Sequence, residues 1–574
     1  MQITLQNLTG RAATRLFTAL SASVVFAACG DSLDGPAPII SNVEPATGTV
    51  GTEVHITGSD FRVGASVSIG SFAATGVDVG TSGTEIFASV PAGVTAGTSY
   101  DVTVENTDGS SDVFAAAFTA IAPVLQFVNG ATKPSGNSGS TVILEGDAFG
   151  DVQGAGQVLF SNGTGGTVAA TIAGVDDWTN TFILTTVPAG AVSGPVLVET
   201  GTGQSGSLPF TVTQNATFSP STISWTETQG MSAAISGHSA TYVPIDDAGG
   251  NTVERVYVFG GAGNNLTPRV DVEYSEIQAD GSLGSFTAGT ALTTGVAYHS
   301  TVAATPFNSK VRGSGYLYVM GGINADGGQP VSAITRVPLN QDGSTGTATS
   351  AGSLPAPLHS FGAAIFRSTI YVAGGATTDN AAVATVYRAA IDTLGNIGAW
   401  EELDAMPQAR SYVPLVIFGG TLYVAGGETA AIAVDDATFN SNATKLSSVV
   451  HARLNLRNGL IAAGWTTSGS SLQKARSKHM VLAAGGSLFI SSGLYAAAGT
   501  GSSENVYGQI NADGTLASFN GATGSNTLLS VGGTNLFNGR AVSYIDASGV
   551  AHVMVLGGAD VTNATNKSSK VIFY

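Results

Sequence analysis

The sequence predicts an all-β chain in which two small β-sandwich domains precede a six-bladed β-propeller. Val, Thr, Ser, Ala and Gly dominate and only 10% of the residues are charged, which suits short strands joined by tight turns. A unit of about ninety residues occurs twice before residue 214, and a shorter unit with paired glycines occurs six times after it. A chain of 574 residues is also too long for a single hydrophobic core.

Composition and charge exclude some classes of protein. The hydrophobic fraction of 43% is too high for a disordered chain. The net charge is -18, and no basic run follows the N-terminal leader, whereas phosphate binding requires a clustered positive field. We therefore expect no nucleic-acid partner.

The N-terminus predicts an export signal. Arg11 and Arg15 precede an apolar run, residues 16–27, which is shorter than the roughly 20 residues that span a bilayer but fits the apolar part of a secretory signal. Ala28 then precedes Cys29, the one cysteine of the chain.

This segment resembles the lipobox of bacterial lipoproteins, although Phe26 stands where that family usually has Leu. The resemblance implies a signal peptide over residues 1–28, lipidation of Cys29 and a tether over residues 29–37. Gly30 stands where an inner-membrane retention signal has Asp, which favours the outer membrane or cell surface of a bacterial envelope. A diacylglycerol group provides the two chains that stable anchoring requires. The alternative is an ordinary signal peptide whose removal leaves a free thiol.

The next region alternates apolar and polar residues and repeats itself. GTEVHITGSDF at residues 51–61 returns as GSTVILEGDAF at residues 139–149, and VPAG at residues 90–93 returns at residues 187–190. Turn signals every 8 to 12 residues or so, in units of this length, are typical of immunoglobulin-sized sandwiches.

These motifs resemble the IPT/TIG family of immunoglobulin-like modules. The resemblance implies one such domain over residues 38–121 and a second over residues 122–214. Some members of that family bind DNA and extracellular members act as spacers or bind partners; the acidity of this chain favours the second role. Residues 176–178 (Asp-Asp-Trp) are expected to form a turn with a packing aromatic, with a contact surface as the alternative.

Beyond residue 218 an apolar strand, usually with a tyrosine, ends in paired glycines, with Ser492 in the place of one of them. The last residues of the six pairs are Gly261, Gly322, Gly375, Gly427, Gly493 and Gly558. A period near 50 with strands and a diglycine predicts a propeller of four-stranded blades. Glycine allows a sharp bend at a strand end and a close approach of the neighbouring blade.

A second feature recurs about 20 residues after the glycine pairs. ADGSLGSF at residues 279–286 and ADGTLASF at residues 512–519 carry Asp-Gly, which predicts a hairpin between the third and fourth strands of a blade. The chain ends after a third strand of the last blade, and TISWTET from Thr222 supplies a fourth, with Trp225 in the aromatic position. The ring is thus predicted to close by pairing its two ends, which removes exposed edges.

This pattern resembles the kelch repeat, in which Arg or His precedes each inner strand. The resemblance implies a six-bladed kelch propeller over residues 218–574 with a ligand face near its axis. The candidate residues of that face are His238, His299, His359, Arg410, Arg476 and Arg540. The alternative is that these side chains buttress the blades through hydrogen bonds, because buried polar groups normally find protein partners.

The longest segment after a diglycine runs from Glu428 to Ser448, and long loops in compact domains are usually functional or disordered. It contributes Asp435 and Asp436 to the candidate ligand face. Two adjacent carboxylates without further spaced oxygen ligands indicate Ca²⁺ only weakly, and no other cofactor is indicated.

Known propeller enzymes give three comparisons. Galactose-oxidase-type enzymes need a cysteine crosslinked to tyrosine, and Cys29 belongs to the export signal, which excludes that chemistry. Sialidases carry Ser-x-Asp-x-Gly, whereas here Gly follows Asp directly. Sialic acid mutarotases are six-bladed kelch proteins and stay open as an alternative. No nucleophile elbow, zinc-ligand spacing or phosphate loop occurs, so no catalytic residue is indicated.

The expected function is recognition without covalent chemistry. A lipid-anchored envelope protein would hold a propeller away from the membrane and bind a protein or a glycan through it, since repeat scaffolds carry variable loops on a rigid face. The alternatives are a carbohydrate-active propeller enzyme, for example with mutarotase-like activity, and a structural envelope component. If the chain is an enzyme, we expect a deep axial pocket with converging carboxylates and perturbed pKa values. If it is a binding protein, we expect a shallow face with exposed aromatic residues.

Overall fold

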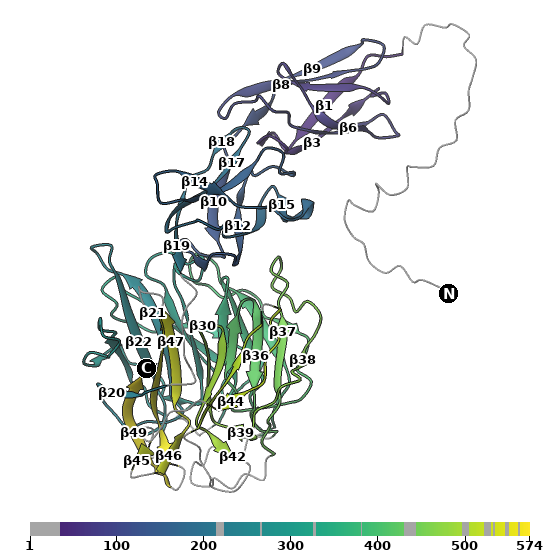
Figure 1. The fold of residues 1–574 in the computed structure, drawn as a ribbon. Coiled ribbons are helices and arrows are strands. Elements are labelled where there is room, and N and C mark those ends of the chain that lie inside the picture. Colours follow the sequence, from purple (N-terminus) through teal and green to yellow (C-terminus); the bar gives the residue numbers. More distant parts are fainter. Residues whose placement is uncertain are drawn as a thin grey trace, which may run out of the picture.

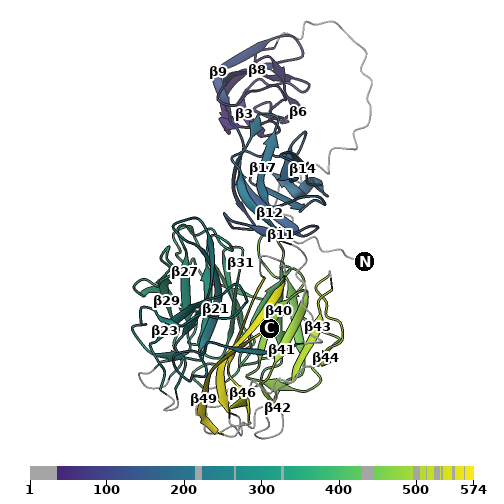
Figure 2. The ribbon, with the colours of Figure 1, turned by 60° about the vertical axis from the view of Figure 1, so that its left-hand side comes forward.

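The computed structural model describes residues 35–213, 223–263, 267–324, 329–379, 381–429, 444–495, 504–511, 513–521, 530–531, 534–545, 550–560 and 563–574. Within these residues every element is a strand except the short 3₁₀ turn η2 (Val175–Asp177), so the predicted all-β class is confirmed. Two sandwiches, which we call modules one and two, lie end to end beyond a ring of sheets (Figures 1 and 2). None of the described segments is a helix that would cross a membrane.

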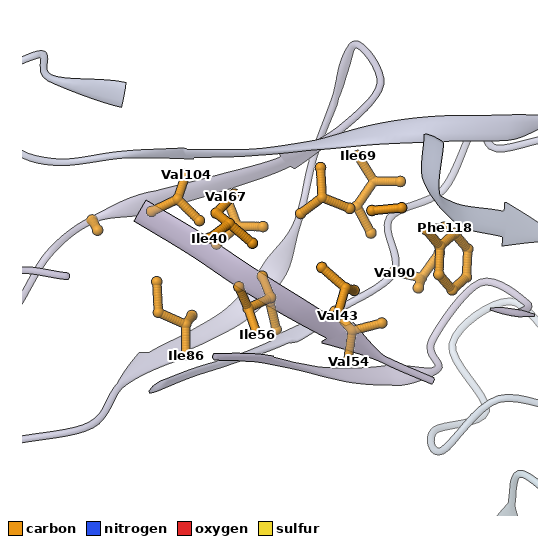
Figure 3. Close-up of a cluster of buried hydrophobic side chains, with 14 of the residues drawn as sticks. Ile40, Val43, Val54, Ile56, Val67, Ile69, Ile86, Val90, Val104 and Phe118 are labelled. Carbon is orange, nitrogen blue, oxygen red and sulfur yellow. The ribbon is translucent and has the colours of Figure 1, made fainter. Parts of the chain in front are cut away.

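Module one consists of two sheets. The first contains β1 (Ile39–Glu44), β3 (Glu53–Ser59), β7 (Glu85–Ser89) and β6 (Thr75–Val79). The second contains β2 (Thr47–Gly48), β9 (Ser111–Ala120), β8 (Ser99–Glu105), β4 (Ser66–Ile69) and β5 (Phe72–Ala73). Alternation along β3 buries Val54 and Ile56 completely, while His55 points to the other face and stacks on Phe87. The buried faces of both sheets meet in an apolar core (Figure 3).

Module two repeats this plan. One sheet contains β10 (Val124–Val128), β12 (Thr141–Asp147), β16 (Phe182–Thr186) and β15 (Trp178–Thr179). The other contains β11 (Ser135–Asn137), β19 (Leu208–Thr213), β17 (Gly194–Thr200), β13 (Gln157–Ser161), β14 (Thr167–Ala169) and β18 (Gly203–Gln204). Trp178 is buried and its Nε1 donates to the carbonyl of Phe149 at 2.9 Å, so the predicted packing aromatic is confirmed.

The remaining strands form six main sheets, which we call blades one to six in chain order. Blade one contains β21 (Ser239–Asp246), β22 (Thr252–Phe259), β23 (Val272–Glu276) and β24 (Thr287–Ala288). Blade two contains β26 (Ser300–Ala304), β27 (Tyr316–Met320), β29 (Ala333–Pro338) and β30 (Thr349–Ser353). Blade three contains β31 (Gly362–Phe366), β32 (Thr369–Ala373), β33 (Val386–Ala390) and β34 (Glu401–Leu403). Blade four contains β35 (Leu415–Phe418), β36 (Thr421–Ala425), β37 (Val449–Arg453) and β38 (Thr466–Thr467). Blade five contains β40 (Met480–Ala484), β41 (Ser487–Ser491), β43 (Asn505–Gln509) and β44 (Asn520–Gly521).

Blade six joins both ends of this region. It contains β47 (Arg540–Ile545), β48 (Ala551–Asp560), β49 (Asn563–Phe573), β20 (Thr226–Thr228), β46 (Thr534–Phe537) and β45 (Ser530–Val531). β20 pairs antiparallel with β49, with Thr226 opposite Phe573, and Trp225 is buried near Phe489 of blade five. Two small pairs, β25 (Val296–Ala297) with β28 (Ile323–Asn324) and β39 (Arg476–Ser477) with β42 (Leu494–Tyr495), lie outside the main sheets.

The innermost strands contact one another in circular order: β21, β26, β31, β35, β40, β47 and again β21. The diglycines lie where two blades meet. Gly374 and Gly375 have φ of +64° and +98°, and a Cβ on Gly374 would lie 2.6 Å from the carbonyl oxygen of Arg410 in the next blade. The N–H of Gly375 donates to that same oxygen at 3.0 Å. The glycine pairs therefore join blades as well as bending strands.

The hairpin between the third and fourth strands of a blade also contacts the preceding blade, whether Asp, Asn or Leu precedes its glycine. The hydroxyl of Tyr318, on the second strand of blade two, donates to the carbonyl of Gly395 in the hairpin of blade three at 2.7 Å, and Arg336 donates to the same oxygen at 3.1 Å. The same tyrosine bond links Tyr257 to Gly343, Tyr371 to Gly459 and Tyr423 to Gly514. Burial raises the pKa of all four phenols, to about 12 for Tyr371 and Tyr423, so each stays a hydrogen-bond donor.

Module two contacts one end of the ring. Arg457 lies 2.8 Å from Asp177, and Arg367 donates to the side chain of Asn129 at 3.1 Å. Lys310 pairs with Glu145. Arg367 follows inner strand β31 and Lys310 follows inner strand β26, so the inner strands end at module two. They begin at the opposite end, where β39, β42, β45 and β46 lie in Figure 1.

Candidate ligand face of the ring

A residue with a left-handed backbone lies two or three residues before each inner strand. These six residues, which we call the axial ring, are Gly237, Tyr298, Ser360, Tyr412, Lys478 and Asn538, with φ between +52° and +61°. A residue with a Cβ pays roughly 1–2 kcal/mol for this conformation. Five of the six positions carry a side chain, so tertiary interactions must compensate the strain.

Backbone hydrogen bonds provide that compensation. The N–H of Tyr298 donates to the carbonyl of Gly237 in the preceding blade at 2.7 Å, and Ser360 donates to Tyr298 at 2.8 Å. Equivalent bonds run from Tyr412 to Ser360, from Asn538 to Lys478 and from Gly237 to Asn538, at 2.8, 3.0 and 3.1 Å. Five of the six blade boundaries are thus bridged near the axis, which satisfies backbone groups where the inner strands converge.

A cavity of about 170 Å³ lies beside the axial ring. Residues from the beginnings of all six inner strands line it, including the hydroxyl residues Ser239, Ser300 and Ser360. Its charged residues are Lys478 and Arg540, and no Asp or Glu is among the residues that line it. The cavity is smaller than the roughly 300–1,000 Å³ of drug-sized ligand sites, so it suits a small group rather than an entire glycan.

The histidines predicted for the ligand face are buried. His299 Nε2 lies 2.7 Å from the hydroxyl of Ser239 in the preceding blade. Burial, helped by the charge of Arg540, lowers the pKa of His299 to about 3 and that of His238 well below its usual range. Both imidazoles are therefore neutral at physiological pH. His359 is also completely buried, with Nδ1 3.1 Å from the hydroxyl of Ser360.

Two of the predicted arginines brace their own blade. Arg410 is buried and donates to the carbonyls of Gly426 and Ser448 at 3.0 and 3.2 Å. Arg476 is buried and donates to the carbonyl of Ser492 at 3.2 Å. Burial lowers the pKa of Arg410 to about 10 and also lowers that of Arg476. This is the geometry of the buttressing alternative.

Arg540 is the member of the predicted group that lines the axial cavity. It is partly exposed, and its Nη1 donates to the carbonyl of Gly539 at 3.1 Å. Burial lowers the pKa of Arg540 to about 10, so the guanidinium stays charged at neutral pH. Arg540 is thus the predicted ligand-face residue with access to a ligand in the cavity.

The six predicted residues do not share one position in the repeat. Relative to the axial ring, His238 and His299 follow it by one residue, His359 precedes it by one, and Arg410 precedes it by two. Arg476 also precedes it by two, and Arg540 follows it by two. Among these six residues, Arg540 lines the axial cavity and the other five are not among its lining residues.

Sequence reasoning missed the axial ring itself. Tyr298, Tyr412, Lys478 and Asn538 all line the cavity. Their rings and charges interact: Tyr298 and Tyr412 meet edge to face at 6.1 Å, and Lys478 Nζ lies 4.4 Å over the ring of Tyr412. Gly237 and Asn538, residue types that tolerate positive φ, were the signal that would have indicated this register.

Three other predicted residues, Cys29, Asp435 and Asp436, lie outside the described residues. In the part of the chain that the structure describes, no three His, Cys, Asp or Glu side chains are grouped as a metal site.

Comparisons with known proteins agree with one part of this architecture. The IPT/TIG domain model matches residues 38–118, which is module one. A search of curated proteins found no match. Among solved structures, one titled "Structure of YjhT" covers 60% of this chain and 95% of its own, with 11% identity and a TM-score of 0.40.

Proposed function

We propose that this chain is a lipid-anchored protein of the bacterial envelope whose ring, a six-bladed propeller of kelch type, recognises a protein or glycan without covalent chemistry. The observation that carries the proposal is the lining of the axial cavity, in which hydroxyls, an amide, an imidazole and two cations lie beside aromatic and aliphatic side chains. Such groups bind a ligand through hydrogen bonds and stacking. Acid–base catalysis by a carboxylate would require a residue type that this lining lacks.

The position of the cavity supports the same function. The beginnings of the inner strands, and with them the axial ring, lie at the end of the blades remote from module two. A lipid on Cys29 would tether the chain ahead of module one, and the two sandwiches would then hold this end away from the membrane. Localisation in the outer membrane or at the cell surface is part of the proposal.

The anchor and the recognition are tested separately. Metabolic labelling with a fatty acid should mark the wild type and miss the Cys29→Ala variant; equal labelling of both would refute the anchor. The soluble Cys29→Ala protein should then bind a defined glycan or protein on an array, and Arg540→Ala should weaken that binding. A glycan or protein that binds equally well to both would remove the cavity as the recognition site.

A carbohydrate-active enzyme is the second candidate, and one carboxylate favours it. Glu428, directly after the diglycine of blade four, is completely buried and its Oε2 lies 3.7 Å from Lys445 Nζ. Ser477 donates to the same oxygen at 2.9 Å, whereas Oε1 has no hydrogen-bond partner among the described residues. The equivalent residues of three other blades are Ala262, Ala376 and Ala559. Turnover of a sugar by the wild type and its loss in Glu428→Gln would replace the binding function by an enzymatic one.

A further inference from the structure

The axial cavity has an excess of hydrogen-bond donors on one side. Lys478 and Asn538 each lie two residues before an inner strand, β40 and β47, and the N–H of Asn538 donates to the carbonyl of Lys478 at 3.0 Å. Arg540 follows two residues later, and all three residues line the cavity. An ammonium has three N–H donors and a guanidinium has five, and neither accepts a hydrogen bond.

The two cations have no carboxylate partner among the described residues. Lys478 Nζ lies over the rings of Tyr412 and Phe537, at 4.4 and 6.0 Å, and Arg540 Nη1 donates to the backbone carbonyl of Gly539. An aromatic face offsets only part of an ammonium charge. Elsewhere in the ring, some cations have carboxylate partners, Lys474 with Glu504 and Arg388 with Glu401, whereas the buried Arg410 donates to two backbone carbonyls.

Asn538 adds an independent observation. It is only 3% exposed, and its Nδ2 has no acceptor among the described residues. A buried amide nitrogen without an acceptor costs free energy, and native structures rarely keep one unless water or a ligand satisfies it. This unsatisfied donor lines the same cavity as the two unpaired cations.

We propose that the axial cavity binds a small oxyanion, a carboxylate or sulfate group, between Lys478, Asn538 and Arg540. Oxyanions accept charge-assisted hydrogen bonds from several donors at once, which satisfies the amide and balances both cations. The cavity volume of about 170 Å³ accommodates such a group, while the rest of a larger ligand would lie outside it. This inference rests on the proposed recognition by the ring, since it names the chemical group that is recognised.

The test is calorimetric titration of the soluble Cys29→Ala protein at constant ionic strength. The probes are sodium glucuronate, sodium sulfate and glucose, the neutral sugar that matches glucuronate. Glucuronate or sulfate should bind, and glucose should bind at least about tenfold more weakly. Binding of sulfate alone identifies a free anion as the ligand, and binding of glucuronate alone identifies a carboxylate carried by a sugar.

Three variants locate the site. Lys478→Met should weaken anion binding by about tenfold or more, because it removes one charge-assisted partner. Asn538→Asp keeps the shape and the tolerance of positive φ but adds a carboxylate, so it should abolish binding without unfolding the protein. Lys474→Met makes the same charge change at an exposed residue outside the cavity and should leave anion binding unchanged.

Two results would overturn the inference. One is equal binding of glucose and glucuronate, and the other is anion binding that Lys478→Met and Asn538→Asp leave intact. If no anion binds while an array ligand still does, the anion site is refuted and the recognition function stands. If the anion binds as expected while no array ligand is found, the site stands and the recognition of a protein or glycan does not.

Discussion

Module one and the centre of the ring are both buried, but they are made of different residues. The buried side chains of module one are apolar, among them Ile56, Val67 and Phe118 (Figure 3), apart from the uncharged Thr49, Thr52 and Asn106. At the ring axis the buried residues include His299 and Arg410. A sandwich packs the faces of two sheets, so only side chains meet there. The ring brings the ends of inner strands together, where backbone N–H and carbonyl groups must be satisfied and buried polar side chains help to satisfy them.

The largest expected difference between the two regions is the loss of stability of the ring at acid pH. His299 and His479 have pKa values lowered to about 3 by burial, against about 6.5 in an unfolded chain. Between these values the unfolded state binds more protons, so the ring loses stability as the pH falls below 6.5, by up to about 1.4 kcal/mol per pH unit for each histidine. The apolar core of module one has no such term.

Calorimetry between pH 7 and pH 5 should therefore move the unfolding transition of the ring down more than that of module one. Blade three has Phe361 at the position that corresponds to His299, so His299→Phe is the matched control and should reduce the pH dependence. Transitions that shift equally in both regions would contradict this account of the ring.

A smaller effect is expected from glycine at a blade joint. Gly374→Ala places a Cβ about 2.6 Å from the carbonyl of Arg410 and also strains φ, so a loss of about 2–4 kcal/mol is expected in denaturant unfolding. Gly139 in module two has a similar φ of +80° but no atom near the added Cβ. Gly139→Ala should thus cost only about 1–2 kcal/mol. Equal losses at the two sites would show that backbone strain alone explains both.

The tyrosine bond between blades has a smaller effect still. Tyr318→Phe removes the donor to Gly395 and leaves a buried carbonyl with fewer bonds, so we expect a loss of about 1–2 kcal/mol in the unfolding of the ring. Tyr100 of module one, whose oxygen accepts from Thr95 at an exposed site, provides the control. Tyr100→Phe should change stability by less than about 0.5 kcal/mol. A larger loss at Tyr100 would contradict the importance of the buried joint.

The smallest expected effect is an increase in the stability of the ring. Ser492 has φ of +61° at the position that glycine occupies in the other blades. Ser492→Gly relieves roughly 1–2 kcal/mol of strain but gives the unfolded chain more freedom, so a net gain of less than about 1 kcal/mol is expected in thermal unfolding. A clear loss would mean that the Ser492 side chain, which is buried, makes a contact worth more than the strain.

The sequence alone determined the features that depend on local conformation. Paired glycines and Asp-Gly hairpins predict positive φ at defined positions, and Gly374, Gly375 and Gly281 all have it. Strict alternation predicted which faces of β3 are buried. Each of these signals lies within a few residues of the structure that it specifies, so no knowledge of distant contacts is needed.

Only the tertiary structure decided which polar residues near the axis reach the cavity. Arg540 lies two residues after the left-handed residue of its blade, whereas Arg410 lies two residues before the left-handed residue of its own. Arg540 reaches the cavity and Arg410 does not, although both precede or begin an inner strand and carry the same guanidinium. The role of each arginine depends on how six inner strands from distant parts of the sequence converge at the axis. The type of a residue does not specify that arrangement.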